Sequence, residues 1–193
     1  MFLVYQYLFV TAIVTHAMRD DTRNVIDEFR GVPTDDIKSM LDQRRNSLQI
    51  AVENLERDFN MGTIIRNANA FNVSTIHVIG RRQWNKRGAM GTDHYMNIQY
   101  HSTVDDFVKN VGGNQIIGID NIEGSVPMGG QKLSSNSILV FGSEGAGLSK
   151  EMIDACSKVV AIEQFGSTRS VNVGVASGIA MYVWIQQNVL ASE

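Results

Sequence analysis

Short apolar runs and helix-periodic stretches alternate along the chain from about residue 47 onward. Mostly apolar stretches of five or six residues, bounded by glycine, asparagine or charge, predict strands over residues 47–52, 75–79, 114–119, 137–141 and 158–162. Apolar residues three and four positions apart predict helices over residues 61–71, 103–111, 150–155 and 172–188. This alternation predicts an α/β fold, a parallel sheet with helices on both faces.

Two segments precede this pattern. Residues 1–17 contain no Asp, Glu, Lys or Arg, yet they are short for a helix that needs about 20 residues to cross a bilayer. They also lack the basic residues that open a secretory signal, so we favour two other interpretations: Met18 is the native start, or the segment is a buried or exchanged strand. Residues 18–46 are charged, and Pro33 followed by acidic residues predicts an arm of two short helices. Residues 47–193 form the predicted main domain.

The composition narrows the chemistry. A chain of 193 residues with 44% apolar and 19% charged residues is typical of a globular protein. One cysteine excludes a disulfide framework and a cysteine-based zinc site, and the 4 histidines lack metal-ligand spacing, so we expect no metal.

The net charge argues at first against a nucleic-acid partner, because 17 Lys and Arg face 20 Asp and Glu, giving −3. Cations are nevertheless concentrated in residues 81–87, which contain no acid and include an indole. Such a basic loop can contact phosphates and stack a base, although an ordinary solvated loop is the alternative. The candidate RNA-binding residues are Arg81, Arg82, Trp84, Lys86 and Arg87.

Polar residues with candidate chemistry follow the predicted strands, at the edge where parallel sheets bind ligands. The first such segment contains Asn60, Gly62 and Arg66 at the start of a predicted helix. We expect Asn60 to cap this helix. Arg66 shares a helix face with Gly62 and Ala70, so its guanidinium is expected to be uncrowded and able to meet a ligand.

Two further segments have the same character. Residues 142–148, which we call the motif loop, contain three glycines that let a backbone pass close to a bound molecule, with Glu144 among them. They are not a phosphate-binding loop, because Leu148 stands where that loop needs lysine. In the last segment, an extended chain would project Ser170 and Asn172 to the same side. Taken singly, each of these polar residues also fits a turn or a helix cap.

Together the three segments resemble the SpoU/TrmH family of RNA ribose 2′-O-methyltransferases, of the SPOUT superfamily, and the resemblance covers roughly residues 48–189. It implies a C-terminal trefoil knot and a homodimer with the active site near the subunit interface. It also implies S-adenosylmethionine as cofactor, held by backbone at Gly142, Ile162 and Val171. The chain departs from the family in two places: Glu163 and Gln164 replace the usual Pro-Met, and Asn72 replaces the usual Gly at the end of the first motif. The matching motif positions are Asn60, Gly62 and Arg66; Gly142, Glu144, Gly145, Gly147 and Leu148; Ser170, Val171, Asn172 and Val173.

The resemblance implies methyl transfer to a ribose 2′-hydroxyl of structured tRNA or rRNA, by a cytoplasmic enzyme that needs no membrane or metal. It makes Arg66 the base, but a guanidinium ordinarily holds its proton, so a charged clamp on the alkoxide or a phosphate is the alternative. The remaining catalytic candidates have positioning roles: Asn60, Glu144, Ser170 and Asn172. One alternative is methylation of an RNA base, but the Asn60–Arg66 motif favours the ribose. The other is a catalytically silent RNA-binding protein, but the presence of all five catalytic candidates argues against it.

Overall fold

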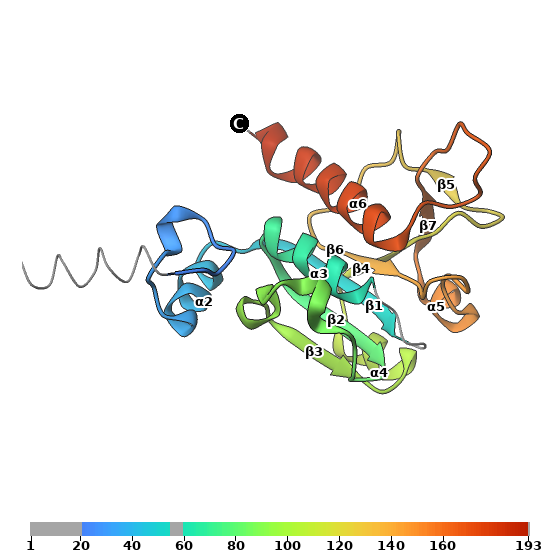
Figure 1. The fold of residues 1–193 in the computed structure, drawn as a ribbon. Coiled ribbons are helices and arrows are strands. Elements are labelled where there is room, and N and C mark those ends of the chain that lie inside the picture. The colour runs from blue at the N-terminus through green and yellow to red at the C-terminus, as the bar shows by residue number, and fades with distance from the viewer. Residues whose placement is uncertain (1–20, 55–59, 193) are drawn as a thin grey trace, which may run out of the picture.

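The computed structural model describes residues 21–54 and 60–192, so the expectations for residues 1–17 lie outside the described residues. A seven-stranded sheet with strand order β3-β2-β1-β6-β4-β7-β5 forms its centre (Figure 1). All neighbouring strands are parallel, which confirms the predicted fold class. The strands are β1 Asn46–Asn54, β2 Val73–Gly80, β3 Ile98–His101, β4 Gln115–Ile119, β5 Val126–Pro127, β6 Ser137–Phe141 and β7 Lys158–Ala161.

Helices cover both faces of this sheet. The α-helices are α2 Thr34–Asp42, α3 Met61–Ala70, α4 Val104–Asn110, α5 Lys150–Ala155 and α6 Val173–Asn188. The 3-10 helices are η1 Asp27–Phe29, η2 Lys86–Ala89, η3 Thr92–Tyr95 and η4 Leu190–Ser192. Helices α3 and α6 pack in one apolar core, and α4 and α5 pack in another. Alternate residues of a strand serve the two cores: Leu139 lies in the first, and its neighbours Ile138 and Val140 lie in the second.

The two outermost strands, β3 and β5, were not predicted. Strand β3 is a four-residue edge strand in which Gln99 and Tyr100 are exposed, so it lacks a continuous apolar run. Strand β5 has two residues, one of which is Pro127. Proline cannot donate to a neighbouring strand and is tolerated at a sheet edge. Both strands are defined by their neighbours in the sheet and not by their own sequence pattern.

The N-terminal arm has a small core of its own. Phe29, Ile37 and Leu41 pack against Tyr95, in a cluster separate from the two sheet cores. Arg45 ties the arm to the sheet, because its guanidinium pairs with Asp42 of the arm at 2.5 Å and donates to the carbonyl of Val73, the first residue of β2, at 3.1 Å. The arm therefore lies at the end of the sheet where β1, β2 and β3 begin (Figure 1).

Helix α6 is apolar on all sides. Its inner side chains Met181 and Trp184 are buried against the sheet, but Val175, Ile179 and Tyr182 are exposed on the outside. A helix that is apolar all round is normally covered on all sides. Within the described ranges, no helix combines the length and the apolarity needed to span a membrane.

Candidate active site

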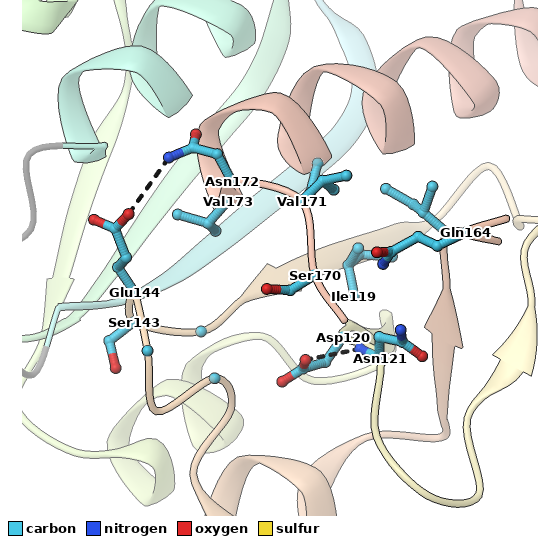
Figure 2. A pocket seen from close by; sticks show the side chains of 15 residues that line it. Ile119, Asp120, Asn121, Ser143, Glu144, Gln164, Ser170, Val171, Asn172 and Val173 are labelled. Atoms are coloured by element: carbon cyan, nitrogen blue, oxygen red, sulfur yellow. Dashed lines mark hydrogen bonds between the residues drawn. The ribbon is translucent and has the colours of Figure 1, made fainter. Parts of the chain in front are cut away.

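A cavity of about 390 Å³ lies where the carboxyl ends of β4, β6 and β7 meet the start of α6 (Figure 2). This volume lies in the range of small-molecule sites. All three residues predicted to hold a cofactor, Gly142, Ile162 and Val171, belong to its wall. The complete wall is formed by Ile119, Asp120, Asn121, Gly142, Ser143, Glu144, Gly145, Gly147, Ile162, Gln164, Ser170, Val171, Asn172, Val173 and Ala176.

Three motif residues distant in sequence meet at the rim of this cavity. The Asn60 amide donates to Glu144 Oε2 at 2.7 Å. The Asn172 amide donates to Asn60 Oδ1 at 2.9 Å and to Glu144 Oε1 at 3.5 Å. We call this set the amide–carboxylate triad. One carboxylate thereby joins the start of α3 to the start of α6.

The triad changes the role predicted for Asn60. The residue precedes α3, but its backbone is helical (φ −80°, ψ −17°) and its side chain forms no capping hydrogen bond. Asn60 does stand at the N-cap position of α3, as predicted, but the side-chain capping bond expected there is not formed, because the amide is engaged by Glu144 and Asn172 instead. Asn172 does cap its helix, accepting from the backbone N–H groups of Gly174 and Val175 at 2.9 and 3.3 Å.

The motif loop closes tightly on itself and presents Glu144 at its tip. The backbone of Ser143 and that of Gly147 exchange two hydrogen bonds of 3.1 and 3.0 Å. A Cβ at Gly142 would collide with the Gly147 and Leu148 backbone, so only glycine allows this closure. Gly147 has φ +71°, a conformation that also favours glycine. Gly145 has φ +92° as well, so all three glycines are required by the loop itself.

Two acids that the sequence interpretation missed hold the motif loop from outside. Asp120, after β4, accepts from the Leu148 N–H at 2.9 Å. Glu53, at the end of β1, is 1% exposed and accepts from the N–H and hydroxyl of Ser149 at 2.8 and 2.7 Å. An acid directly at the end of a predicted buried strand is the sequence signal that could have identified both. The wall of the cavity is therefore anchored on β1 and β4.

Arg66 lies apart from these residues. It is exposed on α3 and is not part of the cavity wall. It lies six positions after Asn60, which corresponds to about 9 Å along a helix. Among the described residues, its side chain forms no hydrogen bond or ion pair. The guanidinium is uncrowded, as predicted, but Gly62 is not the reason: it is buried against η2, where a Cβ would lie 2.7 Å from the Ala89 nitrogen.

Comparison with known proteins agrees with this geometry. The model of the SpoU rRNA methylase family matches residues 47–182. The chain belongs to the SpoU rRNA methylase family. The family domain begins at β1 and contains all three motifs, and it leaves the N-terminal arm outside the match.

Individual relatives of this SpoU chain are distant in sequence, but the matched regions cover most of this chain. It is 25% identical over 151 residues to the tRNA (guanosine(18)-2′-O)-methyltransferase of Escherichia coli strain K12, covering 76% of this chain and 66% of the relative. It is 28% identical over 144 residues to an uncharacterized tRNA/rRNA methyltransferase of Mycobacterium sp. strain KMS, covering 70% and 45%. The chain thus spans about two thirds of the first relative and less than half of the second.

Solved structures show the same fold. The TrmH/SpoU tRNA modifying enzyme of A. aeolicus superposes with a TM-score of 0.72 at 22% identity, covering 82% of this chain and 84% of that one. The AdoMet-bound rRNA methyltransferase of Sinorhizobium meliloti superposes with a TM-score of 0.66 at 25% identity, covering 77% and 60%. The SpoU/TrmH assignment made from the motifs is confirmed.

The basic loop of this SpoU chain differs from the prediction in two side chains. Trp84 is half-buried and packs against the first sheet core, and the Lys86 ammonium lies 5.6 Å from the centroid of its ring. Lys86 also donates to the buried carboxylate of Asp93 at 2.8 Å, a hydrogen bond that raises the pKa of Lys86. In the folded protein an acid, Asp93, therefore lies against the basic loop. Trp84 and Lys86 already stabilise the folded loop.

The three arginines of the basic loop are exposed. Arg82 stacks over the Tyr100 ring at 5.4 Å, while among the described residues the guanidinium groups of Arg81 and Arg87 form no hydrogen bond or ion pair. These three cations remain available to a phosphate backbone. Among the same residues, no cluster of three or more His, Cys, Asp or Glu side chains could hold a metal ion.

Proposed function

We propose that this chain transfers a methyl group from S-adenosylmethionine to a ribose 2′-hydroxyl of tRNA or rRNA. The observation that carries this proposal is the amide–carboxylate triad: three family motifs, from the starts of two helices and the tip of a loop, converge at one cavity. The E. coli relative is named as a tRNA 2′-O-methyltransferase, and one solved neighbour at 22% identity is described with 2-OH methylation of tRNA.

The cavity fits the proposed cofactor. It combines apolar walls at Ile119, Ile162 and Val171 with backbone at Gly142. The carboxamide of Gln164 adds a buried oxygen that no described group satisfies. When bound, S-adenosylmethionine supplies an electrophilic methyl group. The residues that would hold it are Gly142, Ile162, Gln164 and Val171.

The triad and Ser170 position the reacting groups. Glu144 fixes the start of α3 through Asn60, and α3 carries Arg66, so a shift of the carboxylate moves the arginine as well. Figure 2 shows the Ser170 hydroxyl pointing from its loop across the cavity, toward the side on which Glu144 lies. This orientation supports the proposal that Ser170 aligns a ribose oxygen for in-line displacement.

Arg66 acts in this proposal as a charged clamp. A solvent-exposed guanidinium keeps its proton at neutral pH and binds phosphate or a developing alkoxide through paired N–H donors. The exposed position of Arg66 outside the cavity supports contact with the RNA. A pH–rate profile of Arg66→Lys tests the role: a clamp predicts a lower plateau with the same apparent pKa, whereas a base predicts a shifted ascending limb.

A homodimer would complete the site. The exposed face of α6 formed by Val175, Ile179 and Tyr182 fits a second copy of the chain, because it continues an all-apolar helix. The separation of Arg66 from the cavity also suits an active site near a subunit interface. The trefoil knot and a cytoplasmic location remain predictions of the family resemblance. Sedimentation of the purified protein tests the dimer.

Structured RNA is the proposed substrate, and Arg81, Arg82 and Arg87 are its proposed phosphate contacts. Calorimetry with S-adenosylmethionine distinguishes the enzyme from a catalytically silent RNA-binding protein, because only the enzyme requires cofactor binding. Mass spectrometry of tRNA and rRNA from cells with and without the gene should then show one lost 2′-O-methyl group. Loss of a methylated base instead would favour the base-methyltransferase alternative.

A further inference from the structure

Two of the residues that depart from the family pattern, Glu163 and Gln164, follow β7 and face different surroundings. Glu163 is exposed, and its carboxylate accepts from the Gly129 N–H at 2.9 Å, outside the cavity. Gln164 belongs to the cavity wall. Such opposite orientations are expected of neighbours in extended chain. Each departure therefore has a separate physical role, and Gln164 is the one directed toward a ligand.

Gln164 carries an unmet hydrogen-bonding capacity. Its Oε1 is buried and has no hydrogen-bond partner among the described residues. Buried polar atoms are usually paired, and an orphan at a cavity wall indicates a missing partner. Rotation about the terminal torsion exchanges Oε1 with the amide nitrogen, so either atom can be presented to the cavity. The methionine usual at this position has only a weak acceptor.

The position of Gln164 identifies the part of the ligand that it meets. Glu144 follows β6 and Gln164 follows β7, with β4 between them in the sheet, so their strands are about 10 Å apart. Figure 2 shows the two side chains at opposite sides of the cavity. The transferred methyl must lie at the Glu144 side, next to the triad. From its sulfonium the cofactor extends in two arms, the adenosine and the charged amino-acid arm. The apolar side chains of Ile119, Ile162 and Val171 line the wall beside Gln164 and suit the flat adenine better than the charged arm. We therefore place the adenine beside Gln164.

We propose that Gln164 is a specificity-determining residue of the cofactor cavity, whose carboxamide oxygen accepts a hydrogen bond from the exocyclic amine of adenine. This inference rests on the proposed function. In this chain, recognition of the cofactor's adenine then depends on the Gln164 side chain in addition to the loop backbone. It also explains why a polar residue is tolerated at a half-buried position beside Ile119 and Val171.

Calorimetry with two ligands tests the proposal. S-adenosylhomocysteine offers the exocyclic amine, and S-inosylhomocysteine replaces that amine with a carbonyl. The wild-type protein should prefer the adenosyl ligand. Gln164→Met should weaken binding of S-adenosylhomocysteine by about tenfold, as for one lost hydrogen bond of about 1.4 kcal/mol. The ratio of the affinities for the adenosyl and inosyl ligands should fall by the same factor.

Two further variants keep the test decisive. Glu163→Gln alters the other departing residue, keeps an acceptor for the Gly129 N–H, and should bind both ligands as the wild type does. Gln164→Glu retains an acceptor oxygen and should keep the preference for the amine even if Gln164→Met does not fold.

Equal affinity and equal preference in wild type and Gln164→Met would overturn the role of Gln164, as would a wild-type preference for the inosyl ligand. Failure of the wild type to bind either ligand would instead remove the proposed methyltransferase function, together with the inference that rests on it. The two failures are therefore distinguishable.

Discussion

The cavity rim and the basic loop are both polar surface segments that follow strands, yet the structure uses them differently. At the rim, Asn60, Glu144 and Asn172 satisfy one another across three motifs and leave a cavity open beside them. In the basic loop, Lys86 and Trp84 are engaged with Asp93 and the core. Converging motifs identify a site, whereas a run of like charges does not reveal which members stabilise the fold.

The two regions also differ in how their stability is expected to respond to acid. His77, on the β2 strand that leads into the basic loop, is buried and hydrogen-bonded to His101 at 2.9 Å and to Gln49 at 2.8 Å. Burial, and secondarily the charge of His101, lowers the pKa of His77 to about 4. Burial also lowers the pKa of His101, against a smaller raising effect of Asp106. No such pair lies among the residues that form the cavity wall.

The largest expected effect is therefore acid destabilisation. Because the folded-state pKa of His77 lies below the unfolded value of 6.5, the unfolded state binds more protons, and stability falls as the pH drops from about 6.5 to about 4. The loss reaches about 3 kcal/mol at about 1.4 kcal/mol per pKa unit. Urea unfolding at several pH values measures it. His77→Gln should flatten this dependence, and an unchanged slope would show that the pair does not cause it.

Glu144→Gln should give the next largest effect. Asn60 and Asn172 donate to different oxygens of Glu144, and the nearly isosteric amide replaces one of these oxygens with an NH₂ donor, so one of the two donors then faces another donor. Misplacement of α3 and α6 should lower the single-turnover rate of methyl transfer about 10²-fold. The exposed acid Glu123 provides the matched control, Glu123→Gln. A wild-type rate in Glu144→Gln would separate the triad from catalysis.

Gly62→Ala tests the packing of the basic loop onto α3. The added Cβ would lie 2.7 Å from the Ala89 nitrogen and 2.8 Å from the Gly88 Cα, so backbone must move, at a cost of about 1–3 kcal/mol in the free energy of unfolding. Gly112→Ala is the control, since no atom lies within 4 Å of its Cβ position. Equal stability of the two variants would show that η2 is not held by this contact.

The smallest effects concern RNA binding. Arg87→Ala should lower the steepness of the plot of log binding constant against log salt concentration by about 1, as expected for one phosphate contact. Lys86→Ala should reduce it by clearly less, because Asp93 already neutralises that ammonium. The sequence alone predicts equal effects. Filter binding over a range of salt concentrations distinguishes the two, and a larger effect for Lys86 would show that Asp93 releases it on binding.

Most of the site was predictable because it depends on local rules. Parallel strands place their carboxyl ends at one edge, so polar segments after β6 and β7 had to lie near each other. The remaining features depend on contacts between distant residues. The backbone of Asn60 turns helical before α3 begins, which directs its amide to Glu144 instead of a cap. Similarly, the partner of Lys86 lies seven residues away, in η3.

One measurement tests the central claim most directly. Purified protein is incubated with structured tRNA and S-adenosylmethionine that carries a deuterated methyl group, and the digested nucleosides are fragmented in a mass spectrometer. Ribose 2′-O-methyl transfer predicts that the label stays with the sugar fragment, in wild type and far less in Glu144→Gln. Label on the base fragment, or none in either fragment under conditions in which the cofactor binds and the RNA is retained, would contradict it.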